Sequence, residues 1–228
     1  MTAKKRIENH NDPIKNSRLF KDLSSNDFDC VHEVLAPVIK KYDKEEVIIA
    51  QGDVVDKIGI VLSGDILQTK IHHDGSSQII DLFQKGEIVG TESAFSTFTT
   101  SPCFLIANSG CSVAFLSCRE MLDSEDISGI CKETVWENIA NLLSDENIRK
   151  MYKINILSKR GLRERILTFL EILTRKRNST VVDIGMNQGQ FAQYLEVNRS
   201  SLSKELNCMR KEGLIDYKRN VYTLISLR

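Results

Sequence analysis

The sequence predicts an α+β protein in three regions: a β-rich domain preceded by short helices, a long helix, and a compact α+β domain. Short apolar runs separated by glycine and aspartate turns fill residues 41–120, a pattern typical of an antiparallel barrel or jelly roll. A stretch with helical periodicity and no proline follows at 126–157. Helix and strand patterns then share residues 158–228. We therefore place the domain boundaries at 1–125, 126–157 and 158–228.

The first predicted elements are short helices at 17–40, where apolar side chains form a rough helical stripe that ends at Val38. Four short β-rich runs follow, separated by turns that contain glycine beside polar residues. These runs cover 47–49, 58–62, 66–71 and 78–83. Their regular spacing favours an antiparallel sheet structure over further helices.

The helix predicted at 126–157 is too long to belong only to a small barrel. One apolar stripe can pack against the barrel, while another pairs with a second copy of the chain. The candidate dimerisation residues are Val135, Ile139, Leu142 and Leu143. A polar stretch at 144–147 interrupts the stripe, so a helix packed wholly within its own chain stays an alternative.

The third region contains the elements of a compact α+β unit. They are an amphipathic helix at 162–173, a strand at 181–184, short helices at 188–195 and 199–210, and strands at 214–217 and 221–224. The last two strands flank Lys218, Arg219 and Asn220, which indicates a hairpin with a basic tip.

Charge is distributed unevenly along a chain whose formal net charge is zero. Residues 158–228 contain 14 Lys and Arg against 7 Asp and Glu, a balance of +7. The preceding 157 residues therefore carry a balance of −7. A basic last third suggests a polyanionic partner, although a chance imbalance of solvated surfaces would give the same numbers.

The two short helices predict a helix-turn-helix. Leu202, Leu206 and Met209 recur at helical spacing and face inward, which turns the side chains between them outward. Asn198 is placed to cap the second helix by accepting a hydrogen bond from a free backbone N–H. Ser201, in the first turn, can add to this cap or reach a phosphate. A helix-turn-helix reader inserts its second helix into the major groove of DNA.

The outward residues are of the types that such a reader needs. Arg199 can donate two hydrogen bonds to guanine, and Ser200 and Lys204 suit neighbouring base or backbone contacts. Ser203 also faces outward, and short hydroxyl side chains suit phosphate anchoring. Lys218 and Arg219 at the hairpin tip would contact the flanking DNA backbone and make the domain a winged helix. The alternative is an ordinary helical hairpin with a solvated face.

The sequence lacks the signals of several other classes of protein. No apolar run approaches the ~20 residues of a membrane span, and no apolar segment follows the basic start, so we expect a cytoplasmic protein. The six cysteines form no CxxC pair, and the four histidines are scattered, so we expect no metal site. A Gly-rich phosphate loop, an HExxH motif and a nucleophile elbow are all missing, so we expect no enzyme.

Two sets of motifs in the chain resemble those of the cyclic-AMP receptor/Fnr family of bacterial transcription regulators, and they follow one another in the same order as in that family. The first set is a glycine-punctuated jelly roll with Gln51-Gly52-Asp53 and the segments 59–66 and 83–90; the second is the reader segment 190–215. The resemblance covers residues 17–225. It implies a homodimer joined through the long helix, a two-fold symmetric site in double-stranded DNA, and RNA polymerase as a further partner.

The resemblance also shows where this chain departs from the family. In the family's reader pattern Arg-Glu-x-x-x-Arg, Arg199 matches, whereas Ser200 replaces the acidic residue that reads cytosine. We therefore expect an operator sequence different from the family's common one.

The effector site departs further. Cyclic-nucleotide binders of the family carry Gly-Glu and, about ten residues later, Arg-Ser or Arg-Thr; the matching positions here are Gly90-Thr91 and Ser101-Pro102. Glu92 is displaced by one residue. Gly90, Thr91, Glu92 and Ser101 are thus the candidate effector pocket. Without the arginine, a buried phosphate lacks its counter-ion, so we expect no tight binding of cyclic AMP.

Other signals stay open. Cys30 is the only cysteine near the amino terminus, so we expect no iron–sulfur cluster. A haem would need an axial ligand, for which His32 is a remote candidate; a small organic ligand, or none, is the other possibility. The alternative functions are a haem-based gas or redox sensor of the same family and a ligand-sensing module that regulates a protein partner.

Overall fold

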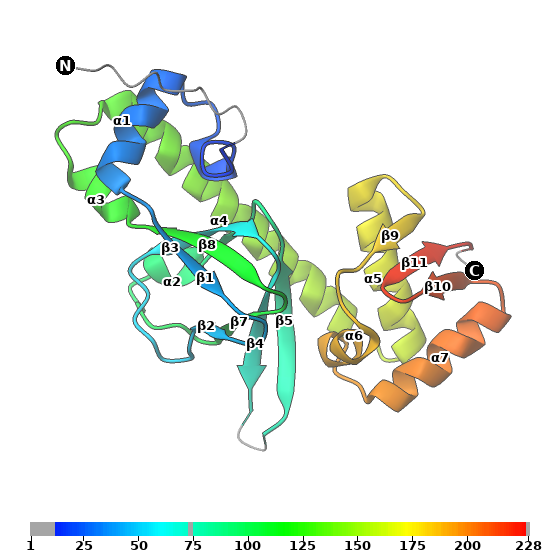
Figure 1. The fold of residues 1–228 in the computed structure, drawn as a ribbon. Helices are drawn as coiled ribbons and strands as arrows, with labels where there is room; N and C mark the ends of the chain where they lie inside the picture. Colours follow the sequence, from blue (N-terminus) through cyan, green and yellow to red (C-terminus); the bar gives the residue numbers. More distant parts are fainter. Residues whose placement is uncertain (1–11, 73–74, 227–228) are drawn as a thin grey trace. The chain divides into compact units, whose positions relative to one another are not determined.

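The computed structural model describes residues 12–72 and 75–226 of the chain (Figure 1). The chain divides into two compact units. The first unit consists of the residues up to Ile66 together with 83–144, and the second consists of 67–82 together with 145–228. This division does not coincide with the three predicted regions, because it separates the strands of 67–82 from the rest of the β-rich region and divides the long helix after Ser144.

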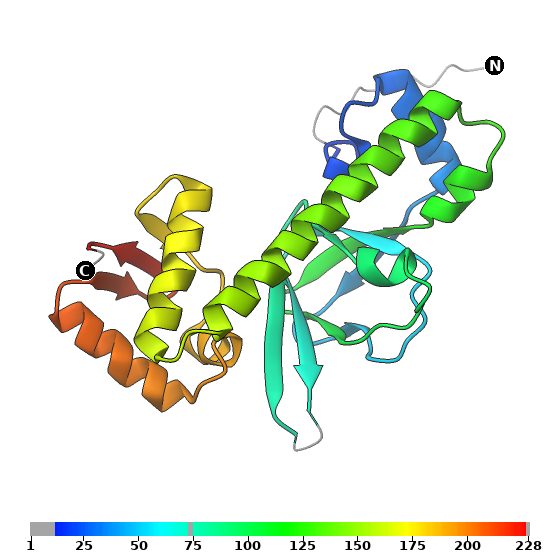
Figure 2. The same ribbon diagram turned by 180° about the vertical axis from the view of Figure 1, so that it is seen from behind.

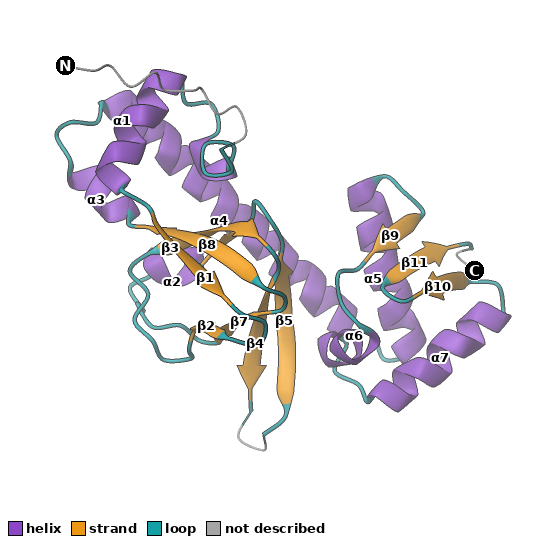
Figure 3. Cartoon of the chain, in the orientation of Figure 1, coloured by secondary structure: helices purple, strands orange, loops and turns teal. Residues whose placement is uncertain are grey.

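The first unit is rich in β-strands, as predicted. Its elements are η1 (Arg18–Phe20), α1 (Ser25–Leu35), β1 (Val38–Tyr42), β2 (Val47–Ile49), β3 (Ile58–Ser63), β6 (Ile88–Val89), α2 (Thr91–Ala94), β7 (Phe104–Ala107), β8 (Cys111–Leu116), α3 (Cys118–Asp123) and the first part of α4 (Gly129–Leu157). One sheet has the strand order β1-β8-β3-β6, and β2 pairs with β7; these pairings are antiparallel (Figure 3).

The prediction that the first helical stripe extends to Val38 is wrong, because Val38 begins strand β1. Helix α1 ends at Leu35, and Ala36 adopts a left-handed conformation with φ 37°. A left-handed residue followed by Pro37 stops a helix, since proline cannot continue the hydrogen-bond pattern. The chain therefore turns directly into the sheet.

The core of the first unit lies between the sheet strands and α4. Ile60, Val89 and Val113 are fully buried on the strands. The long helix begins at Gly129, where the Ser128 hydroxyl accepts a hydrogen bond from the Cys131 N–H at 3.3 Å. It runs without a break to Leu157 (Figure 2), and among the described residues no helix has the length and apolar character that a bilayer span requires.

The second unit contains the carboxy-terminal α+β fold and all but the end residues Ile66 and Phe83 of the strands β4 (Ile66–Ile71) and β5 (Ser77–Phe83), which are neighbours in their sheet. Its other elements are the last part of α4, α5 (Leu162–Arg177), β9 (Val181–Asp183), α6 (Gln188–Tyr194), α7 (Arg199–Lys211), β10 (Ile215–Lys218) and β11 (Val221–Leu224). The last three strands form an antiparallel sheet of order β10-β11-β9. The predicted α+β class is confirmed in both units.

Candidate nucleic-acid interface

Helices α6 and α7 form the predicted helix-turn-helix. Asn187 and Gln190 make a reciprocal capping box at the start of α6, which fixes where that helix begins. After α6, the Val197 N–H donates to the Ala192 carbonyl at 3.0 Å, and Glu196 takes a left-handed conformation with φ 57°. This closed turn sets the direction in which α7 leaves.

The inward stripe predicted for α7 is confirmed. Leu202, Leu206 and Met209 have no exposed surface and pack in the core of the second unit. The opposite side of the helix is polar: Arg199, Ser200, Ser201 and Lys204 are exposed, and Ser203 is half-buried. The helix thus presents a cationic and hydroxyl-bearing surface that its own core does not use.

The predicted role of Asn198 in capping is only partly right. Asn198 occupies the N-cap position, and its backbone carbonyl accepts from the Leu202 N–H at 3.0 Å. Among the described residues, however, no backbone N–H donates to its side chain. The first turn of α7 is exposed, so water can satisfy its free backbone N–H groups in place of a side-chain cap.

The hairpin of β10 and β11 has the predicted basic tip. Lys218 ends β10, and Arg219 occupies the turn with φ 57°; both are exposed. Asn220 secures the turn from the other side, since its amide donates to Asp183 Oδ1 at 2.5 Å and its carbonyl accepts from the Ile184 N–H at 2.9 Å. A surface hollow of about 560 Å³ lies between this turn and the start of α6.

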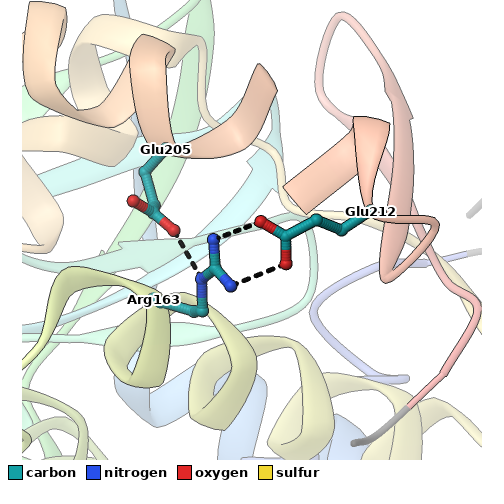
Figure 4. A network of polar contacts seen from close by, with 3 residues as sticks. All are labelled: Arg163, Glu205 and Glu212. Carbon is teal, nitrogen blue, oxygen red and sulfur yellow. Dashed lines mark hydrogen bonds and ion pairs between the residues drawn. The ribbon is translucent and has the colours of Figure 1, made fainter. Parts of the chain in front are cut away.

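An arginine that sequence reasoning missed joins α5 to α7. Arg163 Nε donates to Glu205 Oε1 at 2.6 Å, and its two terminal nitrogens donate to the two carboxylate oxygens of Glu212 at 2.7 and 2.8 Å (Figure 4). The hydrogen bonds that Arg163 donates to Glu212 and Glu205 raise the pKa of its guanidinium. Glu212 lies beyond the helix predicted at 199–210, and nothing in the sequence identified Arg163 as a partner of either glutamate.

A buried lysine, also missed, lies where α4, β5 and α6 meet. Lys153 is only 8% exposed, and its Nζ donates to the carbonyl of Ile79 at 3.1 Å and to that of Tyr194. The same Nζ lies 3.1 Å from the centre of the Tyr194 ring. Burial lowers the pKa of Lys153 to about 7, against the opposing effect of the nearby carboxylates of Glu196 and Asp81.

The candidate effector residues lie in the first unit around α2. Gly90 is the N-cap of α2 with φ 82°, Thr91 is fully buried, and Glu92 is half-buried. Ser101 is buried, and its hydroxyl donates to the Cys103 carbonyl at 2.7 Å. Its single proton is therefore already used within the protein.

The residues considered for other signals lie elsewhere. His32 is half-buried on α1, with its ring 5.4 Å from that of Phe28. Within the described residues there is no group of three or more His, Cys, Asp or Glu side chains that could hold a metal ion.

The residues predicted for dimerisation pack inside the chain itself. Val135, Ile139 and Leu142 are buried in the core of the first unit, and Leu143 is half-buried against that core. Asn138 on the same side of the helix donates to the backbone carbonyls of η1 and the residue after it, which explains why this face turns inward. Other apolar side chains of α4 are exposed: Ile130, Ile148, Met151, Tyr152 and Ile154.

Comparison with protein families gives one match to each part of the chain. Residues 39–123 match the cyclic nucleotide-binding domain, and residues 164–228 match the Crp-like helix-turn-helix domain. Electron transport regulator A of Shewanella oneidensis is 25% identical over 202 residues, which cover 86% of this chain and 78% of that protein.

Solved structures share the fold at low identity. A mutant of CooA from Carboxydothermus hydrogenoformans has a TM-score of 0.71 and 18% identity, covering 94% of this chain and 90% of that one. The c-di-GMP-responsive global regulator CLP of Xanthomonas campestris has a TM-score of 0.70 and 16% identity, covering 90% of this chain and all of that one. These likenesses extend over both the β-rich part and the helix-turn-helix part.

Proposed function

The chain belongs to the Crp/Fnr family of transcription regulators that bind DNA through a helix-turn-helix, and on this basis we propose that it acts as a homodimer on a two-fold symmetric operator. The observation that carries the proposal is the division of α7 into two faces. One face is sealed in the core through Leu202, Leu206 and Met209, and the other exposes Arg199, Ser200 and Lys204. A helix with this division can enter the major groove without disturbing its own domain.

The exposed side chains divide into base and backbone contacts. Arg199, in the first turn, has the two-pronged donor that matches O6 and N7 of guanine. Ser200 and Lys204 follow on the same face and contact neighbouring bases or phosphates. Ser201, Ser203 and the uncommitted side chain of Asn198 anchor phosphates near the start of the helix, where the helix dipole favours negative charge.

The wing supplies contacts that do not depend on sequence. Lys218 and Arg219 are exposed at the turn between β10 and β11. A lysine or arginine on a phosphate releases counter-ions and strengthens binding to every sequence alike. The balance of +7 over residues 158–228 suits this role.

We assign the dimer contact to the exposed face of α4. Ile148, Met151 and Tyr152 are 46%, 56% and 45% exposed, and their spacing of three and four residues places them on one side of the helix. Apolar side chains at this spacing are what a paired helix buries. This face replaces the stripe of Val135, Ile139 and Leu142, which the chain buries itself.

The proposed effector is not cyclic AMP. Thr91 stands where the family's nucleotide binders carry a glutamate, and Ser101 stands where they carry the arginine for the phosphate. The Ser101 hydroxyl already donates to Cys103. The proposed effector is a small organic molecule in the barrel; a haem, for which His32 is the candidate ligand, is the alternative. RNA polymerase is the proposed protein partner.

A salt titration of binding to duplex DNA tests the proposal. For a DNA-binding protein, the logarithm of the association constant falls linearly with the logarithm of the salt concentration, with a slope of roughly −0.9 per phosphate contacted. We expect a slope of about −3.6 or steeper for the dimer, because four or more cationic phosphate contacts contribute about −0.9 each. A flat salt dependence would favour the alternative in which the carboxy-terminal domain binds a protein.

A further inference from the structure

We propose that Arg163 is a positioning residue for DNA reading: it holds α7 against α5 and neutralises two carboxylates on the flank of the reading helix. Arg163 lies on α5, not on α7 or the wing, and it acts through Glu205 and Glu212. The inference rests on the proposed assignment of α7 as the reading helix.

The geometry of the contact is that of a brace. Glu205 and Glu212 are seven residues apart, which is about two helical turns, so they lie on the same side of α7. Glu212 is the C-cap residue, where the helix ends. One guanidinium therefore contacts the middle and the end of the helix at once, through three hydrogen bonds of 2.6, 2.7 and 2.8 Å (Figure 4).

This brace restrains the rotation of α7 about its own axis more than apolar packing does. Leu202, Leu206 and Met209 hold α7 by buried apolar contacts, and the hydrophobic effect that drives them is non-directional. The paired, planar bonds between Arg163 and Glu212 are directional. A small rotation of α7 would move Arg199 and Lys204 relative to base edges, so the brace affects which sequence is read.

The two carboxylates also matter for electrostatics. Glu205 is one turn beyond Ser201, which we assign to a phosphate, so the carboxylate and the phosphate lie on the same side of the helix. Glu205 and Glu212 are partly exposed, with 26% and 47% of their side chains accessible. Left unpaired, they would repel the DNA backbone, most strongly at low salt. Arg163 offsets part of this negative charge.

Three variants separate the proposed role from a direct phosphate contact by Arg163. Arg163→Gln removes the brace and leaves both carboxylates unpaired. Arg163→Gln/Glu205→Gln/Glu212→Gln removes the brace and the carboxylates together. Arg175→Gln, at the far end of α5, makes the same change in charge away from α7 and is the matched control. Affinity is measured for a selected operator and for a random duplex, with thermal unfolding as the check on folding.

Arg163→Gln is expected to weaken binding to the random duplex by about tenfold, the size of one charge-assisted contact, and binding to the operator by about five times more, because the brace is lost as well. The triple variant is expected to recover affinity for the random duplex to within about twofold of wild type, but to keep a ratio of operator to random affinity about fivefold below wild type. Arg175→Gln is expected to leave that ratio unchanged.

Recovery is the decisive result. If the triple variant binds the random duplex as weakly as Arg163→Gln, and the salt slope falls by about 0.9 for each half-site, Arg163 contacts a phosphate and the proposal is overturned. Equal binding by Arg163→Gln and wild type also overturns it. Should Arg163→Gln fail to fold, Glu205→Gln/Glu212→Gln gives the same test: a lower operator ratio supports the brace, and an unchanged ratio overturns it. Failure of wild type to bind any duplex would instead contradict the proposed function.

Discussion

Arg199 is the residue on which base recognition depends in this account. Its exposed position in the first turn of α7 allows a two-pronged contact with one guanine. Arg199→Ala is expected to remove discrimination at one base position of each half-site, with a loss of ~1–3 kcal/mol for the preferred base and little change for the others. Binding to a set of operators with single substitutions measures this. A uniform loss over all of them would show that Arg199 contacts only the backbone.

Lys218 represents the other class of contact. At the end of β10 it is exposed beside the wing turn. Lys218→Ala is expected to weaken binding to all sequences by a similar factor and to reduce the salt slope by about 1 for each half-site. Titrations at several salt concentrations check this, with Lys176→Ala, an exposed lysine in the last turn of α5, as the control. A change in sequence preference would contradict the assignment.

Lys153 makes the stability of the second unit depend on pH. Its pKa is about 7 in the folded protein against an ordinary value of 10.5, because burial disfavours the charged form. Between these values the unfolded chain binds the proton and the folded chain does not, so stability rises as pH increases from about 7 to about 10. The charged and titratable groups around it are Asp81 on β5, Arg149 on α4, and Tyr194 and Glu196 at the end of α6.

Replacing this lysine tests the linkage. Lys153→Met keeps the volume and removes the titration, so the variant is expected to lose a slope of up to ~1.4 kcal/mol per pH unit in the free energy of unfolding. Urea unfolding at pH 7, 8 and 9 measures the slope. Lys150→Met, at an exposed position of the same helix, is expected to keep it. Identical slopes for wild type and Lys153→Met would disprove the assignment.

Among the elements, α7 and α4 show what periodicity can and cannot predict. The inward stripe of α7 was predictable, because Leu202, Leu206 and Met209 repeat at helical spacing. The stripe of Val135, Ile139 and Leu142 was equally visible, but the pattern indicates only that a face is covered and not what covers it. The contacts of Arg163 and Lys153 were not predictable, since charged residues are expected at the surface unless a distant partner is known.

The exposed face of α4 makes a prediction about assembly. Ile148→Glu/Met151→Glu places charges in the proposed helix pair, and we expect it to convert the dimer to a monomer at micromolar concentration. Lys150→Glu is the control, because Lys150 is exposed and lies two residues from both Ile148 and Tyr152, which turns it to another side of the same helix. Val135→Ala is expected to cost ~1–3 kcal/mol of stability through its cavity without opening the dimer directly.

Analytical ultracentrifugation measures whether each variant is a monomer or a dimer. A monomer from Lys150→Glu together with a dimer from Ile148→Glu/Met151→Glu would place the contact on a different face of α4.

For the whole molecule, the sequence predicted the order of its parts better than their packing. The glycine turns of the first 120 residues and the reader segment were sufficient for the family, because both are local patterns. Grouping of 67–82 with the carboxy-terminal residues was not foreseen, since it depends on side chains such as Leu67 and Ile79, which pack in the core of the second unit. Local periodicity carries no information about such long-range contacts.

Selection of bound sequences from a random duplex pool tests the central claim most directly, with and without cell extract to supply an effector. The account predicts enrichment of an inverted repeat whose half-sites are about 10 base pairs apart, bound by two copies of the chain. Enrichment of no sequence at low ionic strength, or of a single half-site bound by a monomer, would contradict it.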